Sequence, residues 1–312
     1  SILSLNIGGI NDRKKRASAR VYLRSLKPDI VCLQETHIQY SERQMLDDLG
    51  LHRLIVTKQS TRTKGVAVLA RLNPDYKFRT AADIQGRWVI IESQINGSKF
   101  TICGIYGSNA DDPTSIETVN AELFSWPAPV IICGDLNCSI KRITDSTVSI
   151  VRKPRTAAAI ERLMKDHGLV DVWDQLYPLE SGYTYYSAPH KKYTRLDYFL
   201  ISNSILSVSS IILLPKVISD HNPLQLLITS QGGQPLKHDR WTFERSLLLE
   251  DDYKIRTKRW IDEFFEFNDD TAALEVVWDT FNAALRGHTE QYSRQKQTQL
   301  RATRTSLSEQ LI

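Results

Sequence analysis

The sequence has no long apolar run, no cysteine pairs at metal-binding spacing and no strong excess of charge of either sign. A membrane-spanning helix needs roughly 18 or more consecutive apolar residues. No run approaches that length, so we expect no membrane partner. The amino-terminal stretch also lacks the layout of a signal peptide. These absences predict a soluble intracellular protein.

Cysteine is scarce and is not arranged for cross-linking. The four cysteines, Cys32, Cys103, Cys133 and Cys138, mostly lie in apolar, strand-like segments, and no C-x-x-C spacing occurs. This pattern indicates reduced core side chains and argues against both a disulfide framework and a zinc site.

The composition is that of a globular chain. Of 312 residues, 41% are hydrophobic and 24% are charged, which excludes disordered and collagen-like classes. The formal net charge is +4, with the basic excess confined to the first 230 residues. A balance of this size suits local phosphate binding but is weak evidence by itself. The length allows one large domain with an appendage.

Strand patterns outnumber helix patterns, and the two do not alternate regularly. We therefore expect a layered α/β sandwich with polar residues collected at one edge of its sheets. The predicted strands are 1–7, 30–33, 66–70, 88–92, 100–105, 130–133, 183–187, 195–201 and 223–228, and the predicted helices are 14–26, 42–49 and 156–166.

A boundary is predicted at the Gly/Pro-containing stretch Ser230–Pro235, beyond which the periodicity is helical. Apolar stripes at helical spacing are more often core than cofactor site. One predicted stripe comprises Ile255, Trp260, Ile261, Phe264 and Phe265, and the other comprises Leu274, Val277, Trp278, Phe281 and Leu285.

The chain is organised around Pro129–Asn137, which reads PVIICGDLN. Its apolar run predicts a strand buried on both faces. A glycine then interrupts the run and places Asp135 and Asn137 at the carboxyl end of the strand. Taken alone, the segment is more typical of a strand followed by an ordinary turn than of a functional site.

Other predicted strands also end in polar residues. Each has an ordinary explanation as a loop or edge residue, but acids, amides and one histidine at successive strand ends are what metal-assisted phosphoryl chemistry needs. The set comprises Asn6, Glu35, Tyr106, Asp135, Asn137, Thr184, Asp197, Ser219, Asp220 and His221.

Hydrolysis of a phosphodiester assigns roles within this set. The attacking water must be oriented or deprotonated by a carboxylate, which suits Asp135 steadied by Asn137. The oxygen on which charge builds needs a donor, which suits His221 held by a carboxylate such as Asp197.

The segments LNIGGI, LQETH, GIYGSN, CGDLN, RLDYFLIS and SDHNP, in this order, resemble the endonuclease/exonuclease/phosphatase superfamily, which includes abasic-site endonucleases and pancreatic deoxyribonuclease. YTYYSAPHKKYTRLDY and GRWVIIE resemble the endonuclease domain of LINE-type, L1-group non-LTR retrotransposons. WTFERSLLLED, WIDEFF and VVWDTFNAALRG resemble the linker that leads to the reverse transcriptase in those polyproteins.

This resemblance implies a DNase I-like, four-layer α/β/β/α sandwich of two mixed sheets over residues 1–230, followed by a helical linker over 231–312. It implies a Mg²⁺-dependent endodeoxyribonuclease, with Mn²⁺ as a substitute ion, that nicks one strand of double-stranded target DNA in the nucleus. The 3′-hydroxyl would prime reverse transcription of the element's RNA by the polymerase domain of the same polyprotein.

The resemblance also implies residue roles. It places Glu35 and Asn6 at the metal, with Asp220 supporting the metal through water, and Tyr106 near the scissile phosphate. It keeps Asp135, Asn137, Asp197 and His221 in the roles above. It places Thr184, Ser219 and Asn109 near DNA or phosphate.

Basic and aromatic residues mark two further candidate DNA contacts. The first is the segment Ser187–Thr194, with His190, Lys191, Lys192 and Tyr193, which could equally be an ordinary exposed hairpin. The second is Arg152, Lys153 and Arg155 before the helix from Thr156, where solvated charge is the alternative.

Two positions depart from the family pattern. Gly8 stands where the family usually has Asn or Asp, which leaves more of the metal to Glu35 and Asp220. Gly107 and Ser108 stand where the retrotransposon pattern has a small residue and proline, so we expect a looser loop. An abasic-site repair endonuclease and a non-catalytic docking module of the same fold are the alternative functions.

Overall fold

The computed structural model describes residues 1–72, 79–95, 98–127, 129–141, 145–147, 153–178, 180–228 and 245–267, together with eight single residues between 278 and 296. The chain divides into two compact units, Ser1–Gln234 and Pro235–Ile312, which are treated separately below.

The first unit contains two six-stranded sheets of mixed direction. In the first sheet, β1 and β2 are parallel, because helix α1 (Arg13–Leu26) crosses between them, and the other neighbours are antiparallel. Its order is β13 (Ser209–Leu213), β14 (Leu224–Ile228), β1 (Ile2–Asn6), β2 (Ile30–Gln34), β4 (Ala67–Ala70) and β3 (His52–Val56).

The second sheet has the same mixed character, with β7 and β8 parallel across helix α2 (Thr114–Leu123). A separate hairpin pairs β10 (Tyr185–Ser187) with β11 (Lys192–Thr194). The order of the second sheet is β5 (Thr80–Ala82), β6 (Trp88–Ile95), β7 (Ser98–Tyr106), β8 (Val130–Asp135), β12 (Asp197–Ser202) and β9 (Leu169–Asp171).

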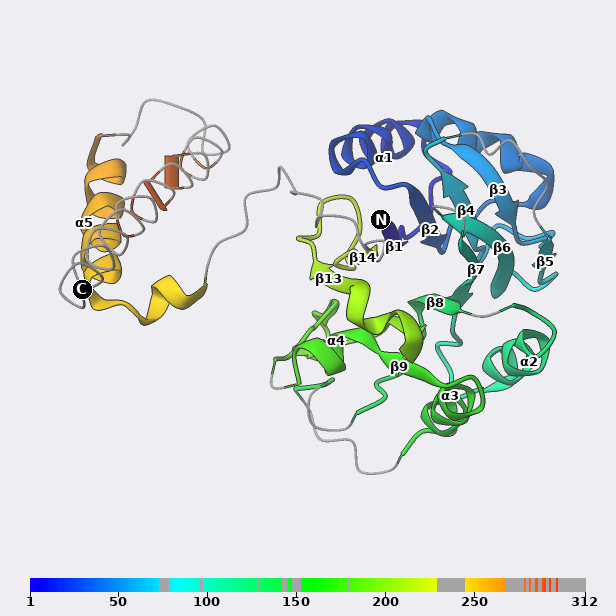
Figure 1. Ribbon diagram of the computed structural model, residues 1–312. Coiled ribbons are helices and arrows are strands. Elements are labelled where there is room, and N and C mark those ends of the chain that lie inside the picture. Colours follow the sequence, from blue (N-terminus) through cyan, green and yellow to red (C-terminus); the bar gives the residue numbers. More distant parts are fainter. Residues whose placement is uncertain are drawn as a thin grey trace. The chain divides into compact units, whose positions relative to one another are not determined.

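Three apolar layers hold the sandwich together. Between the sheets, residues such as Cys32 and Val68 pack with Ile102, Cys133 and Phe199. Helix α1 and the 3₁₀ helix η1 (Tyr40–Leu49) cover the outer face of the first sheet, and α2 and α3 (Arg155–Asp166) cover that of the second (Figure 1). The predicted α/β/β/α sandwich is confirmed. The shorter helices are α4 (Val172–Leu176) and η2 (Asn203–Val208).

Some element predictions need correction. The helix predicted over 42–49 is the 3₁₀ helix η1, and it begins two residues earlier, at Tyr40. The glycine of the central stretch does not interrupt its strand, because β8 continues through Gly134 to Asp135. Strands β3, β5, β9 and β13 and helix α2 were not predicted; the four strands are short or partly exposed.

The second unit contains η3 (Arg245–Leu249) and α5 (Asp251–Phe267). Trp260 packs near Phe264, Phe281 and His288, with ring centroids 5.6, 5.9 and 5.0 Å apart. The predicted stripe is partly wrong, because Ile255 is 61% exposed. Tyr253, two positions earlier, is buried in its place. Leu274 and Val277 lie outside the described residues.

All four cysteines are free and buried, as predicted for reduced core residues. No helix among the residues that the structure describes combines the length and apolar character that a membrane crossing requires.

Candidate active site

The site lies where strand ends of both sheets meet. In the second sheet, Asp135 at the end of β8 pairs in register with Tyr106 on the parallel strand β7 and with Asp197 on the antiparallel strand β12. In the first sheet, Asn6 on β1 pairs with Gln34 on β2, so Glu35 follows directly. Strand register therefore brings residues far apart in the sequence to one edge.

Asp135 is the centre of the hydrogen-bonded group. Its side chain is fully buried. Oδ2 accepts from Asn6 Nδ2 at 2.8 Å, and Oδ1 accepts from the backbone N–H of Asn137 at 2.8 Å. His221 Nε2 lies 3.9 Å from Oδ2. A buried carboxylate with these donors is held in a single orientation.

The environment of Asp135 favours its protonated form. Burial is the largest cause and raises the pKa of Asp135 to about 7, with the charge of Asp197 adding to the rise, whereas His221, Asn6 and the Asn137 backbone act to lower it. A carboxyl group with a pKa near neutrality is suited to take up a proton from water.

His221 and Asp197 form a buried pair. His221 Nδ1 lies 2.8 Å from Asp197 Oδ2. Burial alone would lower the pKa of His221, but the charge of Asp197 and the hydrogen bond to it raise the pKa to about 10. At neutral pH His221 is therefore an imidazolium that can donate from Nε2. Tyr185 packs against its ring, with centroids 4.8 Å apart.

Glu35 lies at the more open side of the site. Its Oε1 accepts from Asn6 Nδ2 at 3.0 Å, and its Oε2 lies 3.2 Å from His37 Nε2. Glu35, His37 and Asn137 all have positive φ, at 50°, 54° and 49°. For non-glycine residues this conformation is strained, and such strain concentrates at functional sites.

The loop after β7 is held tightly, contrary to the prediction of a looser loop. A Cβ on Gly107 would lie 2.2 Å from the Leu136 carbonyl oxygen, so only glycine fits this close approach. The Gly107 carbonyl accepts from Asn137 Nδ2 at 3.2 Å and from Arg87 Nη1 at 2.5 Å. Gly107 and Ser108 depart from the retrotransposon pattern, but close packing and these hydrogen bonds still hold the loop in place.

Tyr106 and Asn109 line the same loop. The Tyr106 hydroxyl donates to Asn109 Oδ1 at 3.1 Å, and Asn137 Nδ2 donates to the same oxygen at 3.1 Å. Burial and the neighbouring charges of Glu35 and Asp135 raise the pKa of Tyr106 well above its usual value. The phenol therefore keeps the hydrogen that it donates to Asn109.

The donor set fits a hard divalent cation. Glu35 supplies a carboxylate that is 23% exposed, and carboxylate oxygen is what Mg²⁺ prefers. Asp135, Asp197 and His221 offer ligand atoms within 4.8 Å of one another, but His221 is protonated and bound to Asp197. A cation is therefore better accommodated at Glu35, on the more open side of the site.

Asn6, which the resemblance places at the metal, is bonded within the protein in this structure. Its amide nitrogen bridges Glu35 and Asp135, while its oxygen accepts from the backbone N–H of Gly8 at 3.0 Å. All of its polar atoms are thus used within the protein, and it fixes the spacing of the two carboxylates.

Thr184 also differs from the prediction of a DNA contact. It is fully buried, and its Oγ1 accepts from the backbone N–H groups of Leu196 and Asp197 at 3.0 and 3.2 Å. It therefore anchors the start of β12, which carries the partner of His221.

The predicted DNA-contact residues lie in different settings. His190 and Lys191 are exposed in the turn of the β10–β11 hairpin, and Lys192 is half-buried. At the start of α3, the Asp111 carboxylate accepts from the backbone N–H groups of Arg155 and Thr156 at 3.0 and 2.9 Å. That helix end already holds an anion, so the structure does not leave it open for phosphate. Arg152 lies outside the described residues.

Ser219 and Asp220 precede His221 at the rim. Ser219 Oγ lies 3.3 Å from Asp220 Oδ1 and accepts from the His221 backbone N–H at 3.3 Å. Asp220 is exposed. The two residues are thus beside the His221–Asp197 pair without being buried with it.

The sequence analysis missed several supporting residues. His37 contacts Glu35, and Lys15 Nζ donates to the Gly8 carbonyl at 2.9 Å. Arg195 is buried between Asp145 and Asp171, with Nη2 at 2.8 and 2.7 Å from their carboxylates. His37 and Arg195 each carried a signal, as residues within the LQETH and RLDYFLIS segments.

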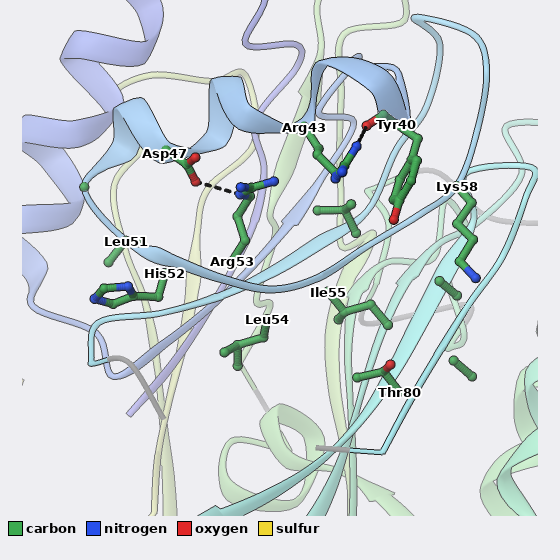
Figure 2. A pocket seen from close by; sticks show the side chains of 14 residues that line it. Tyr40, Arg43, Asp47, Leu51, His52, Arg53, Leu54, Ile55, Lys58 and Thr80 are labelled. Atoms are coloured by element: carbon green, nitrogen blue, oxygen red, sulfur yellow. Dashed lines mark hydrogen bonds and ion pairs between the residues drawn. The ribbon is translucent and has the colours of Figure 1, made fainter. Parts of the chain in front are cut away.

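A cavity of about 930 Å³ lies away from this group (Figure 2). It is formed by η1 and the edge strands β3 and β5, and its lining includes Arg43, Arg53, Ile55 and Thr80. None of the strand-end residues lines it, so the chemistry lies at the strand ends and not in this cavity.

Comparison with known proteins identifies the family. A model of the endonuclease/exonuclease/phosphatase family matches residues 3–221. The chain belongs to this family. An exodeoxyribonuclease from Bacillus subtilis (strain 168) is 24% identical over 257 residues, covering 73% of this chain and 98% of that protein.

Solved structures of similar proteins show the same fold. An AP endonuclease from Leishmania major has a TM-score of 0.62 at 20% identity, covering 73% of this chain and 87% of its own. An AP endonuclease from Archaeoglobus fulgidus has a TM-score of 0.60 at 20% identity, and the match covers 73% of this chain and 99% of that one. A 3′ phosphatase from Neisseria, bound to a product DNA hairpin, has a TM-score of 0.59 at 19% identity. The match covers 73% of this chain and 99% of that one.

Proposed function

We propose that this protein is a metal-dependent nuclease that hydrolyses a phosphodiester bond of duplex DNA at abasic sites. The observation that carries the proposal is the buried arrangement of Asp135 between Asn6 and the His221–Asp197 pair. The abasic substrate is supported by the two AP endonucleases among the similar structures. Mg²⁺ is the expected ion, because the donors are oxygen atoms.

In the proposed reaction, Asp135 orients the attacking water and accepts its proton, with Asn137 fixing one carboxylate oxygen. His221 donates from Nε2 to the phosphate oxygen on which charge builds, and Asp197 keeps the ring oriented. Tyr106 supplies a further donor from the adjacent loop. A divalent cation held by Glu35 would neutralise phosphate charge and stabilise the leaving oxygen.

A second candidate is a nickase of intact DNA whose 3′-hydroxyl product primes reverse transcription of a retrotransposon RNA. Two observations favour it. The β10–β11 hairpin exposes His190, Lys191 and Tyr193, as expected of an element that follows a groove, and a separate helical unit follows the nuclease unit. The proposed partners are target DNA, a reverse transcriptase domain and element RNA, and the proposed place of action is the nucleus.

The test is cleavage of three substrates by the 312-residue protein: a duplex with one abasic site, the matched intact A/T-rich duplex and supercoiled plasmid, each with Mg²⁺, with Mn²⁺ or with EDTA. Faster cleavage of the abasic duplex supports the first candidate, and efficient nicking of the intact substrates supports the second. Mapping the nicks gives strand polarity and sequence preference.

Site variants test the chemistry itself. We expect Asp135→Asn and His221→Asn each to reduce cleavage by about 10²-fold or more, because each removes a proton-transfer or charge-stabilising group. Arg53→Met, remote from the site, is the control. Equal cleavage by all four proteins would refute the proposed site.

A further inference from the structure

Arg87 contacts the loop after β7, yet the proposed chemistry assigns it no role. It belongs to the segment GRWVIIE. Its backbone carbonyl accepts from the Tyr106 backbone N–H at 2.7 Å, next to the in-register pair Trp88 and Ile105 of strands β6 and β7. The central carbon of its guanidinium lies 4.9 Å from the centroid of the Tyr106 ring, within the range of a cation–π contact.

The guanidinium group also bonds the backbone of this loop. Arg87 Nη1 donates to the Gly107 carbonyl at 2.5 Å and lies 3.4 Å from the Tyr106 carbonyl oxygen. The backbone of Arg87 is itself fixed by a turn, because its N–H donates to Asp83 Oδ2 at 2.8 Å. A planar guanidinium that contacts a ring and a carbonyl at once holds the loop in a defined position.

The Gly107 carbonyl connects Arg87 to the residues that act on water. It also accepts from Asn137 Nδ2 at 3.2 Å, and the Gly107 backbone N–H donates to the Asp135 carbonyl at 2.7 Å. The Asn137 backbone N–H in turn donates to Asp135 Oδ1 at 2.8 Å. A series of three hydrogen bonds therefore links Arg87 to the Asp135 carboxylate.

We propose that Arg87 is a positioning residue for the hydrolytic step. Through the Gly107 carbonyl, it keeps Asn137 and the Asp135 carboxylate in the orientation that the reaction needs. The inference rests on the proposed function, since it assumes that Asp135 acts on the attacking water. The alternative role is direct contact with DNA, because Arg87 also lines a cavity of about 210 Å³ whose lining includes Lys64. Positioning affects the rate of the chemical step, whereas direct contact affects the affinity for DNA.

The test is single-turnover cleavage with Mg²⁺ and the 312-residue protein in excess, on whichever of the three DNA substrates the parent cleaves fastest. It gives the maximal rate constant and the protein concentration for half-maximal rate. Arg87→Met should lower the rate constant by about tenfold or more and change the half-maximal concentration by less than about twofold, because it displaces reacting groups without removing a DNA contact. Arg87→Lys keeps a donor for the Gly107 carbonyl but not the flat contact with Tyr106, so its rate constant should be intermediate.

Arg79→Met is the matched control. Arg79 makes the same two kinds of contact away from the site, since its guanidinium carbon lies 4.2 Å from the Trp126 ring centroid and its Nη1 donates to the Ser125 carbonyl at 2.6 Å. The maximal rate constant of this variant should stay within about twofold of the parent value.

A double-mutant cycle tests the route through Asn137. Asn137→Ala removes the amide that donates to the Gly107 carbonyl. In that background, Arg87→Met should lower the rate constant by less than about twofold, because both changes break the same series of hydrogen bonds. Losses that simply multiply would show that Arg87 does not act through Asn137 and would overturn the proposal.

The remaining outcomes separate this proposal from the proposed function. A parent protein that cleaves none of the three substrates would refute the function. A parent that cleaves DNA, with Arg87→Met keeping the parent rate constant, would overturn the positioning role and leave the function standing, whether or not the half-maximal concentration rises. An equal loss in Arg79→Met would overturn it as well. All assays are run below the melting temperature of every variant, so that folded proteins are compared.

Discussion

At the scale of single residues, Asp135 and His221 have pKa values that suit opposite tasks. The carboxyl group has a pKa of about 7 and the imidazole of about 10, so near neutrality one can accept a proton while the other still carries one. The division follows from position. Asp135 is desolvated beside a second carboxylate, whereas His221 is hydrogen-bonded to that same carboxylate, Asp197.

His221 should give the free energy of unfolding a distinct pH dependence. Its folded-state pKa of about 10 lies above the unfolded value of 6.5. Protonated His221 therefore stabilises the folded protein fully below pH 6.5, the unfolded pKa, and this stabilisation is lost as the pH rises through the folded pKa of about 10. Between the two values, the free energy of unfolding of the metal-free protein should fall by about 1.4 kcal/mol per pH unit from this group.

Urea unfolding in EDTA at about pH 7 and about pH 9 measures this slope. His221→Gln, which cannot be protonated, should reduce the difference between the two pH values. The same pH dependence in the parent and in the variant would contradict the assignment.

At the scale of elements, Gly107 links two strand ends. Its backbone N–H donates to the Asp135 carbonyl at 2.7 Å, and its own carbonyl accepts from Asn137. Gly107→Ala would force the loop away from Leu136. We expect a loss of about 1–3 kcal/mol in the free energy of unfolding, with reduced cleavage. Ser108→Ala, next in the chain, should leave both nearly unchanged, and denaturant unfolding with a cleavage assay distinguishes the two variants.

Arg195 connects the segment before β12 to two other elements. Its guanidinium is 3% exposed and pairs with Asp145 and Asp171, and the Tyr198 hydroxyl donates to Asp145 Oδ2 at 3.0 Å. Arg195→Met would leave two buried carboxylates without their cation, so we expect a destabilisation of about 3–5 kcal/mol.

The surface pair Arg53–Asp47 is the matched control for Arg195. Both of its side chains are partly exposed, at 31% and 51%, and Arg53→Met should cost about 1 kcal/mol or less. Chemical denaturation of both variants checks the contrast. A similar small loss for Arg195→Met would show that the buried ion pairs are not needed for stability.

The sequence predicted the central strands and the strand-end residues, because apolar runs such as that of β8 end directly in the polar residues of a family motif. It did not predict the edge strands, which are short or partly exposed and do not end in residues of a family motif. Nor did it predict the partners of Arg195, since Asp145 and Asp171 lie 50 and 24 residues away. Helix α2 did carry a signal, with Ile116, Val119 and Leu123 at helical spacing.

At the scale of the whole molecule, every residue assigned to the site belongs to the unit Ser1–Gln234. This unit has its own three apolar layers. We therefore expect a fragment of residues 1–234 to fold and to cleave DNA at the rate of the full chain. Loss of cleavage by a folded fragment would show that the second unit contributes to the site.

The register of β8 with β12 has a consequence for how such enzymes diverge. Asp135 and Asp197 stay opposite each other because the ladder aligns them, while the 61 residues between them form β9 at the edge of the same sheet and the β10–β11 hairpin outside it. Insertions or deletions in that excursion, which includes the β10–β11 hairpin, can alter the surface presented to substrate without moving the two carboxylates. The fold thereby allows target preference to evolve separately from the hydrolytic chemistry.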